Sequence, residues 1–203
     1  ERAGLKLALG KPARAFAHLD RAETIVVLDG DIFVEHPAAM RYSRDWKASR
    51  GPEGSSLGDG KMNRLWAIES TFSSTGAMAD HRLPLRAELI LPVAQAIDAK
   101  LSSGGAPSAE FLNEAKVQKF LDVLVEELQQ NRGRAVVIAG RRQPAAVDAL
   151  VARINAAIDA PVDYLDDGDD RLTHAEAIAD LAKDIKAKAV SHLFILGGNP
   201  VYD

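Results

Sequence analysis

The segment AVVIAGRRQPAAVDALVARINAAI, residues 135–158, contains the pattern that decides the fold. Its first five residues form a short apolar run rich in valine and isoleucine, which is typical of a buried strand. Gly140 follows at once, and Pro144 precedes a run with apolar residues at three- and four-residue spacing. A strand followed by a turn and a helix is the repeating unit of a parallel sheet. The segment therefore predicts one βα unit.

Further apolar runs of this kind alternate with helical patterns along the chain. The predicted strands cover residues 24–28, 64–68, 135–139, 162–165 and 192–196, of which 162–165 is the weakest. The predicted helices cover residues 38–49, 86–101, 145–158 and 175–188, and a fifth begins near Ser108 and ends at Asn131 and Gly133. This alternation predicts an α/β, Rossmann-like fold whose mostly parallel sheet or sheets are flanked by helices.

Two stretches rich in Gly, Ser and Pro, at 51–60 and 102–107, interrupt these patterns. We take the second stretch as a boundary between two βα lobes. Residues 1–104 would form a first Rossmann-like lobe with two strands, and residues 105–203 a second one with three. The sequence leaves open whether the two lobes share one sheet.

Composition narrows the class of protein. With 203 residues, of which 47% are hydrophobic and 27% charged, the chain has the mix of a packed domain rather than a disordered one. The net charge of −4 and the lack of a basic run argue against nucleic acid as a partner. The absence of cysteine excludes disulfides and cysteine-bound zinc or iron–sulfur clusters within this segment. The longest apolar run, 89–97, is too short to span a membrane, and we expect both ends to be cut from a longer chain.

Glycines at the ends of the predicted strands are the first candidates for a ligand site. In a parallel sheet, the loops beyond the carboxyl ends of the strands present backbone N–H groups to ligands. Gly30, Gly140, Gly197 and Gly198 hold such positions, although a glycine also simply permits a tight turn. Arg141, directly after Gly140, would suit a phosphate or a carboxylate, and it could equally be an exposed surface residue.

Common catalytic and metal-binding motifs are missing from the sequence. There is no Gly-x-Gly-x-x-Gly fingerprint, no phosphate loop ending in Gly-Lys-Ser/Thr and no Gly-x-Ser-x-Gly elbow. The five histidines lack the spacing of metal ligands. The acidic run at 166–170 lacks the alternating ligands of a calcium loop and predicts a solvated turn. We therefore predict no catalytic residue and no metal ligand in this segment.

The most informative stretch for function is RLWAIESTFSSTGAMADHRLPLRAELI, residues 64–90. A strand ends at Glu69-Ser70, a threonine-rich turn follows, and Ala79-Asp80 and Leu83-Pro84-Leu85-Arg86 lead into a helix. This pattern resembles the molybdopterin oxidoreductase family, in which a strand ends in Asp-Pro-Arg and is followed by Ala-Asp and Leu-Pro-Ile-Arg-Pro-Gly-Thr-Asp. In that family the loop holds the guanine end of molybdopterin guanine dinucleotide. A carboxylate there accepts hydrogen bonds from the guanine edge, while an arginine and backbone amides meet the pyrophosphate.

Other segments extend the resemblance over most of the chain. They are residues 20–23, 29–31, 36–45 and 135–144, and the ending LGGNPVYD at 196–203. Together with TGAMADHRLPLR at 75–86, this ending makes the chain most similar to the molybdopterin-like, iron–sulfur-linked subunits of alternative complex III, a quinol-oxidising respiratory assembly. Residues 145–190 match in pattern alone.

The departures from the family pattern bear on the cofactor. Ser70 stands where the family has proline, Thr71 where it has the phosphate-facing arginine, and residues 87–90 replace Pro-Gly-Thr-Asp. Losing one charged donor to phosphate weakens binding by about 1.5–3 kcal/mol. The resemblance therefore implies a fold that is kept without its cofactor. It places weak or vestigial cofactor positions at Asp29, Gly30, Glu69, Ser70, Thr71, Asp80, Arg86, Gly140, Arg141, Gly197, Gly198 and Asn199.

Three hypotheses about function follow. The preferred one is a non-catalytic, cofactor-free scaffold domain of a molybdopterin oxidoreductase-like subunit. By resemblance, its partners are other subunits or domains of a membrane-attached electron-transfer complex on the periplasmic side of the inner membrane. The second is an active molybdenum oxidoreductase fragment in which Glu69, Asp80, Arg86 and the loop at 197–200 bind molybdopterin guanine dinucleotide. The third is a stand-alone nucleotide- or solute-binding α/β module.

Overall fold

The computed structural model describes residues 1–50, 62–102, 109–166 and 174–199. The chain divides into two compact units, residues 1–168 and residues 169–203. Several predicted features lie outside the described residues, namely the break at 51–60, most of the break at 102–107, the helix cap Ser108, the acidic residues 167–170 and the end of the chain from Pro200. All the strands of the described residues belong to the larger unit.

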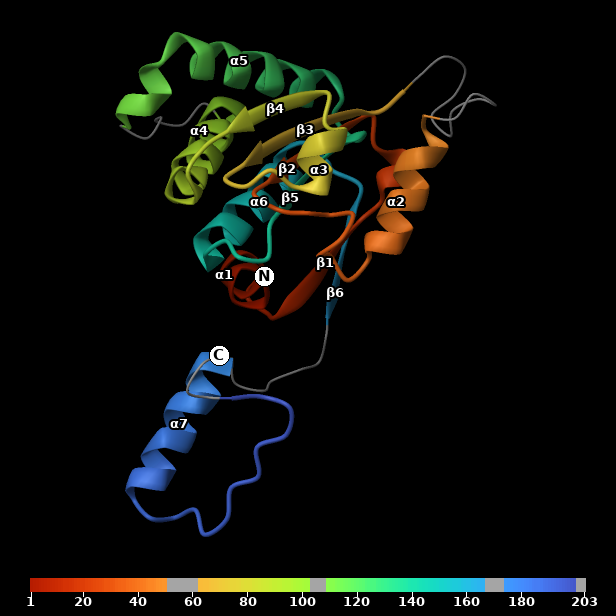
Figure 1. The fold of residues 1–203 in the computed structure, drawn as a ribbon. Helices are drawn as coiled ribbons and strands as arrows, with labels where there is room; N and C mark the ends of the chain where they lie inside the picture. Colours follow the sequence, from red (N-terminus) through yellow and green to blue (C-terminus); the bar gives the residue numbers. More distant parts are fainter. Residues whose placement is uncertain (51–61, 103–108, 167–173, 200–203) are drawn as a thin grey trace. The chain divides into compact units, whose positions relative to one another are not determined.

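A four-stranded parallel sheet forms the centre of the larger unit (Figure 1). Its strands are β2 (Thr24–Leu28), β3 (Arg64–Glu69), β4 (His81–Pro84) and β5 (Ala135–Ala139), in the spatial order β4-β3-β2-β5. Leu28 lies level with Ile68 and with Ala139, so the three longest strands end at one edge of the sheet. Helices flank this sheet, which confirms the predicted α/β, Rossmann-like fold.

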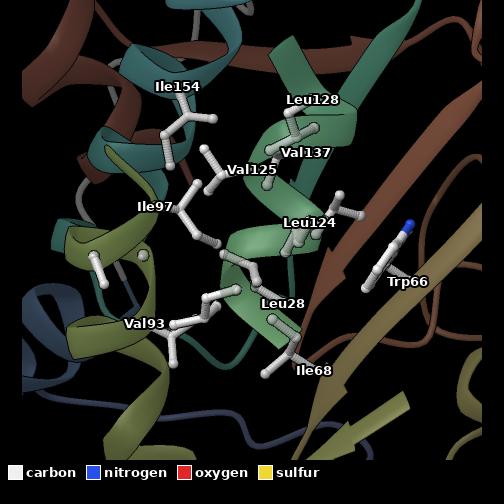
Figure 2. Packing of buried hydrophobic residues seen from close by; sticks show 14 of the residues in the cluster. Leu28, Trp66, Ile68, Val93, Ile97, Leu124, Val125, Leu128, Val137 and Ile154 are labelled. Atoms are coloured by element: carbon white, nitrogen blue, oxygen red, sulfur yellow. The ribbon is translucent and has the colours of Figure 1, made fainter. Parts of the chain in front are cut away.

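One face of the sheet is covered by three helices. They are α4 (Ile90–Ser102), α5 (Ala115–Gln130) and α6 (Ala145–Ala157). Figure 2 shows Val93 and Ile97 of α4 and Leu124 of α5 gathered against Leu28 and Ile68 of the sheet. Burial of one such leucine, isoleucine or valine contributes about 1.5–3 kcal/mol, so this layer supplies much of the stability.

The opposite face packs against α2 (Ala39–Ala48). Ile25 and Val27 of β2 meet Tyr42 of α2 in this second cluster. All five residues of β2 are buried, as expected for a parallel strand with helices on both faces. The buried sheet therefore forms a rigid frame for the loops at its ends.

Two helix starts differ from the predicted ones by a turn or more, whereas α2, α6 and α7 begin within one residue of the prediction. The predicted helix 86–101 begins with a 3-10 turn, Ala87–Leu89, before α4. The predicted start near Ser108 is replaced by a 3-10 turn at Glu110–Asn113, and α5 begins only at Ala115. No helix in the described ranges combines the length and the apolar composition that a membrane crossing needs.

A two-stranded ribbon lies outside the parallel sheet. The predicted strand 162–165 forms β6 (Val162–Asp166), and it pairs antiparallel with β1 (Ala13–Ala17). Sequence patterns did not predict β1, nor α1 (Arg2–Leu9), β4, the short helix α3 (Ser74–Met78) or the 3-10 turn Leu19–Arg21. These elements are short and their apolar patterns are weak, so their partners in the fold decide their conformation.

The expected boundary near residue 104 does not separate two sheets. β5 comes from the predicted second lobe, yet it pairs with β2 of the predicted first lobe along its whole length. β6, the other strand that forms in the predicted second lobe, pairs with β1 of the first. Residues 1–168 therefore form one unit around a shared core.

The smaller unit contains α7 (His174–Lys186) but not the strand predicted at 192–196. That prediction is wrong for the described residues, although the run is apolar. Phe194 and Leu196 are 84% and 92% exposed. A strand needs a neighbouring strand to bond its N–H and C=O groups, and no described strand pairs with this run.

Candidate functional site

The strand order creates a crevice between the ends of β2 and β5. The chain proceeds from β2 to β3 and β4 on one side and then returns to β5 on the other side of β2. Open parallel sheets bind ligands beyond the carboxyl ends of the strands at such a switch point. Here the crevice is lined by Gly30, Asp31, Ile32, Glu35, His36, Ala139, Gly140 and Arg141, and its volume is about 10 Å³. That volume holds about one water molecule.

Two predicted site residues, Gly30 and Gly140, bring the backbones of two loops into contact at this crevice. A Cβ on Gly140 would lie 1.7 Å from the carbonyl oxygen of Asp29, and a Cβ on Gly30 would lie 2.7 Å from the Cα of Gly140. The Gly140 N–H donates to the carbonyl oxygen of Leu28 at 2.7 Å. Both glycines are therefore required by the close approach of the loops, which accounts for them without a ligand.

Asp29 joins the loops that follow β2, β3 and β5. Its Oδ1 accepts hydrogen bonds from the N–H and the hydroxyl of Ser70, both at 2.7 Å. Its Oδ2 accepts from Nε2 of Gln143 at 2.7 Å. The backbone of Asp29 has a φ of 52°, a left-handed conformation that aspartate tolerates better than most residues. The predicted residues Asp29 and Ser70 thus lie together, with their polar groups bonded to each other.

Asp31 holds the N-terminal end of α3 in the same way. Its Oδ1 accepts from the Thr75 hydroxyl at 2.9 Å, and its Oδ2 accepts from the Ser74 N–H at 3.0 Å. The Thr75 oxygen in turn accepts from the Ile32 N–H at 3.0 Å. The sequence reasoning missed Asp31, Thr75 and Gln143 as parts of this network. Asp31 had a signal in the Asp-Gly-Asp after β2, whereas Thr75 and Gln143 lay in the quoted segments 75–86 and 135–144 without being singled out.

Glu69, the predicted guanine-reading carboxylate, points into the fold. It is 2% exposed. Its Oε1 accepts from Nε of Arg82 at 2.5 Å, and its Oε2 accepts from the Ser73 hydroxyl at 2.6 Å. A Cβ on Gly76 would lie 1.8 Å from Oε1, so the first turn of α3 closes over the carboxylate. These residues do not fit a guanine ring at Glu69, because its acceptors are occupied and covered.

Asp80 does not lie with Glu69, contrary to the grouping that the resemblance implied. It binds Arg50 and accepts from the Leu65 N–H at 2.7 Å, at the amino end of β3. Glu69 lies four positions after Leu65 along the strand, which is about 13 Å. Burial alone would raise the pKa of Asp80, but the hydrogen bonds from Arg50 and Leu65 lower it below the usual range. Asp80 therefore acts as a structural ion-pair partner at the opposite edge.

The remaining predicted residues are exposed. Thr71 follows β3, and Arg86 pairs with Glu88 at 3.0 Å. Arg141 donates to the carbonyl oxygen of Glu35 at 3.2 Å at the rim of the crevice. The predicted residues Gly197, Gly198 and Asn199 belong to the smaller unit and are exposed as well. The structure thus brings together Asp29, Gly30, Ser70, Gly140 and Arg141.

Among the described residues, no group of three or more His, Asp or Glu side chains is arranged to hold a metal ion. A scan against models of known protein families gives no match to the chain. A search of the curated proteins gives no match either.

Proposed function

We propose that this chain is a cofactor-free scaffold domain of a molybdopterin oxidoreductase-like subunit in a quinol-oxidising electron-transfer complex. The observation that supports this proposal best is that the carboxylates at the strand ends are bonded by the chain itself. Asp29 is bonded to Ser70 and Gln143, and Glu69 to Arg82 and Ser73.

A nucleotide would have to displace these internal hydrogen bonds. Leaving one buried partner unsatisfied costs about 1–3 kcal/mol, and more where the partner is charged, as Arg82 is. Thr71 supplies no positive charge for a phosphate, and Arg141 already donates to the Glu35 backbone. The loops therefore support a role in stabilising the fold and in contacting neighbouring subunits rather than in binding a dinucleotide.

The direct test has two measurements. Isothermal titration calorimetry of the 203-residue chain with GDP and with ADP should give no saturable heat up to about 1 mM nucleotide. A dissociation constant of about 1 mM corresponds to a binding free energy of about −4 kcal/mol. The purified parent complex should contain no molybdenum and no guanine nucleotide in stoichiometric amount. Stoichiometric molybdenum with guanine nucleotide in the parent would overturn the proposal in favour of an active oxidoreductase.

The crevice between β2 and β5 favours a second candidate, a nucleotide- or solute-binding module. Its location at the switch point and the arginine at its rim are the supporting observations. Saturable binding of both GDP and ADP by the chain would favour this module. Native mass spectrometry of the freshly purified chain would show whether a solute is retained.

A further inference from the structure

A second cavity lies beside the outer edge of β5, and it shares His36, Ala139 and Arg141 with the lining of the crevice. Val137 lines it from β5, Tyr164 from β6, and Ala152 from α6. In a strand–helix–strand unit the strand after the helix commonly pairs with the strand before it. Here β6 pairs with β1 instead, and the cavity of about 40 Å³ lies between β5 and the β1–β6 ribbon.

The cavity is not suited to an additional strand, because a side chain already covers the edge of β5. The Val137 N–H donates to Oδ1 of Asn155 at 2.9 Å, and Nδ2 of Asn155 donates to the Val137 carbonyl oxygen at 2.9 Å. The amide of Asn155 thus takes the place of a neighbouring peptide group. What remains beside the Asn155 amide is a partly open pocket whose walls are mostly apolar.

Tyr164, Tyr42 and His36 each present an uncharged hydrogen-bond donor to this space. The Tyr164 hydroxyl is buried next to the side chain of Asn155, which is close enough to lower its pKa but forms no well-aligned hydrogen bond with it. The Tyr42 hydroxyl accepts from the Ala17 N–H at 3.2 Å, which leaves its own proton free to donate. His36 accepts from the Ala38 N–H through Nδ1 at 3.0 Å, so the neutral ring carries its proton on Nε2. A ligand here needs acceptors.

The residues that line the cavity disfavour a charged ligand. Burial raises the pKa of Tyr42, Tyr164 and Asp148 and lowers the pKa of His36, so each of these four groups is shifted toward its neutral form. The other charged residues that line the cavity are Glu1 and Arg141. The backbone nitrogen of Glu1 lies 3.0 Å from Oδ2 of Asp148. An ionic ligand would lose much of its hydration here, and the one guanidinium on the lining, that of Arg141, is exposed and donates to the carbonyl oxygen of Glu35.

We propose that this cavity binds a small uncharged molecule, the size of one six-membered ring, that carries hydrogen-bond acceptors such as a ring carbonyl. The cavity has room for about three water molecules, whose combined bulk is about that of such a ring. The tyrosine hydroxyls and His36 supply the polar contacts, and the aliphatic walls supply the apolar ones. This site goes beyond the scaffold role and does not depend on it.

The test uses 2-pyridone as the probe and the full 203-residue chain, with amide NMR shifts as the readout. We expect saturable shifts at Val137, Ala139, Val162 and Tyr164, with a dissociation constant of about 1 mM. Benzene, which lacks an acceptor, and benzoate, which is charged, should each bind about tenfold more weakly.

Variants of the chain distinguish binding in the cavity from binding at the surface. Tyr164→Phe keeps the ring and removes the donor, so 2-pyridone should bind about tenfold more weakly. Ala152→Leu fills the cavity and should abolish binding. Leu165→Ala, at an exposed position of the same strand, should bind as the unaltered chain does. Absence of saturable shifts in the unaltered chain, equal binding of benzene, or unchanged binding in Tyr164→Phe would each overturn the proposal.

Discussion

Gly140 shows how a single residue controls the candidate site. Its Cα faces the Asp29 carbonyl so closely that a methyl group has no space, since the added carbon would lie 1.7 Å from that oxygen. The same contact places Gln143 where it can bond Asp29. The strand-end glycine in the sequence therefore marked a special position correctly, but its cause is the close contact between loops and not a positive φ or a ligand.

We predict that Gly140→Ala destabilises the fold by about 3 kcal/mol or more, because the two loops must separate or the strand ends must shift. Urea denaturation followed by circular dichroism measures this loss. Gly10→Ala is the matched control. Gly10 has a φ of 76° and open space around its Cα, so only the left-handed backbone is penalised, by about 1 kcal/mol. Equal losses for the two variants would contradict the steric explanation.

At the scale of secondary-structure elements, Asp80 links the end of α2 to β3 and β4. It binds Arg50, which follows α2, and the Leu65 amide in β3, and it directly precedes β4. β4 is a short edge strand of four residues that ends in proline, so its backbone pairing is limited. The ion pair therefore helps to hold β4 in register with β3.

We predict that Asp80→Asn lowers the free energy of unfolding by about 1–2 kcal/mol at pH 7. The folded state lowers the pKa of Asp80, so its contribution is fully present above the unfolded pKa, near 3.9. The contribution is lost as the pH falls through the still lower folded value. The difference between variant and unaltered chain should thus shrink below about pH 4, as urea denaturation at several pH values would show.

Glu88→Gln is the control for this experiment, because Glu88 forms an exposed pair with Arg86. Such pairs contribute about 0–1 kcal/mol. A loss for Asp80→Asn that does not change with pH would mean that packing, rather than charge, accounts for the role of Asp80.

At the scale of the whole molecule, the stability resides in the larger unit. The three apolar clusters of buried residues all lie within residues 1–168. In the smaller unit, α7 leaves Ile178 67% exposed and Ile185 46% exposed. The described side chains of this unit therefore add little buried apolar area to the fold.

We predict that a chain ending at residue 168 folds with a thermal midpoint within about 3 °C of the full chain. Calorimetry and a dispersed NMR spectrum would test this. A truncated chain that melts without cooperativity, or far below the full chain, would show that the core needs residues 169–203.

The sequence by itself determined β2, β3 and β5 and the longer helices α2, α4, α5 and α6. The spacing of their apolar residues predicts both the type of element and the face that is buried. The strand at 192–196 was wrongly predicted because an apolar run specifies burial but not a partner. The placement of β6 also needed its pairing partner, which is β1, far away in the sequence.

Only the tertiary structure decided which groups the carboxylates of the candidate site are bonded to. Asp29 is bonded by Gln143, 114 residues away, and Asp80 lies at the opposite end of β3 from Glu69. A motif gives the order of residues along the chain. In a parallel sheet, however, the end of one strand and the start of the next lie at opposite ends of the strands, so neighbouring residues of the motif are separated. The saturation of Asp29 depends on contacts between distant loops, and local patterns carry no information about such contacts.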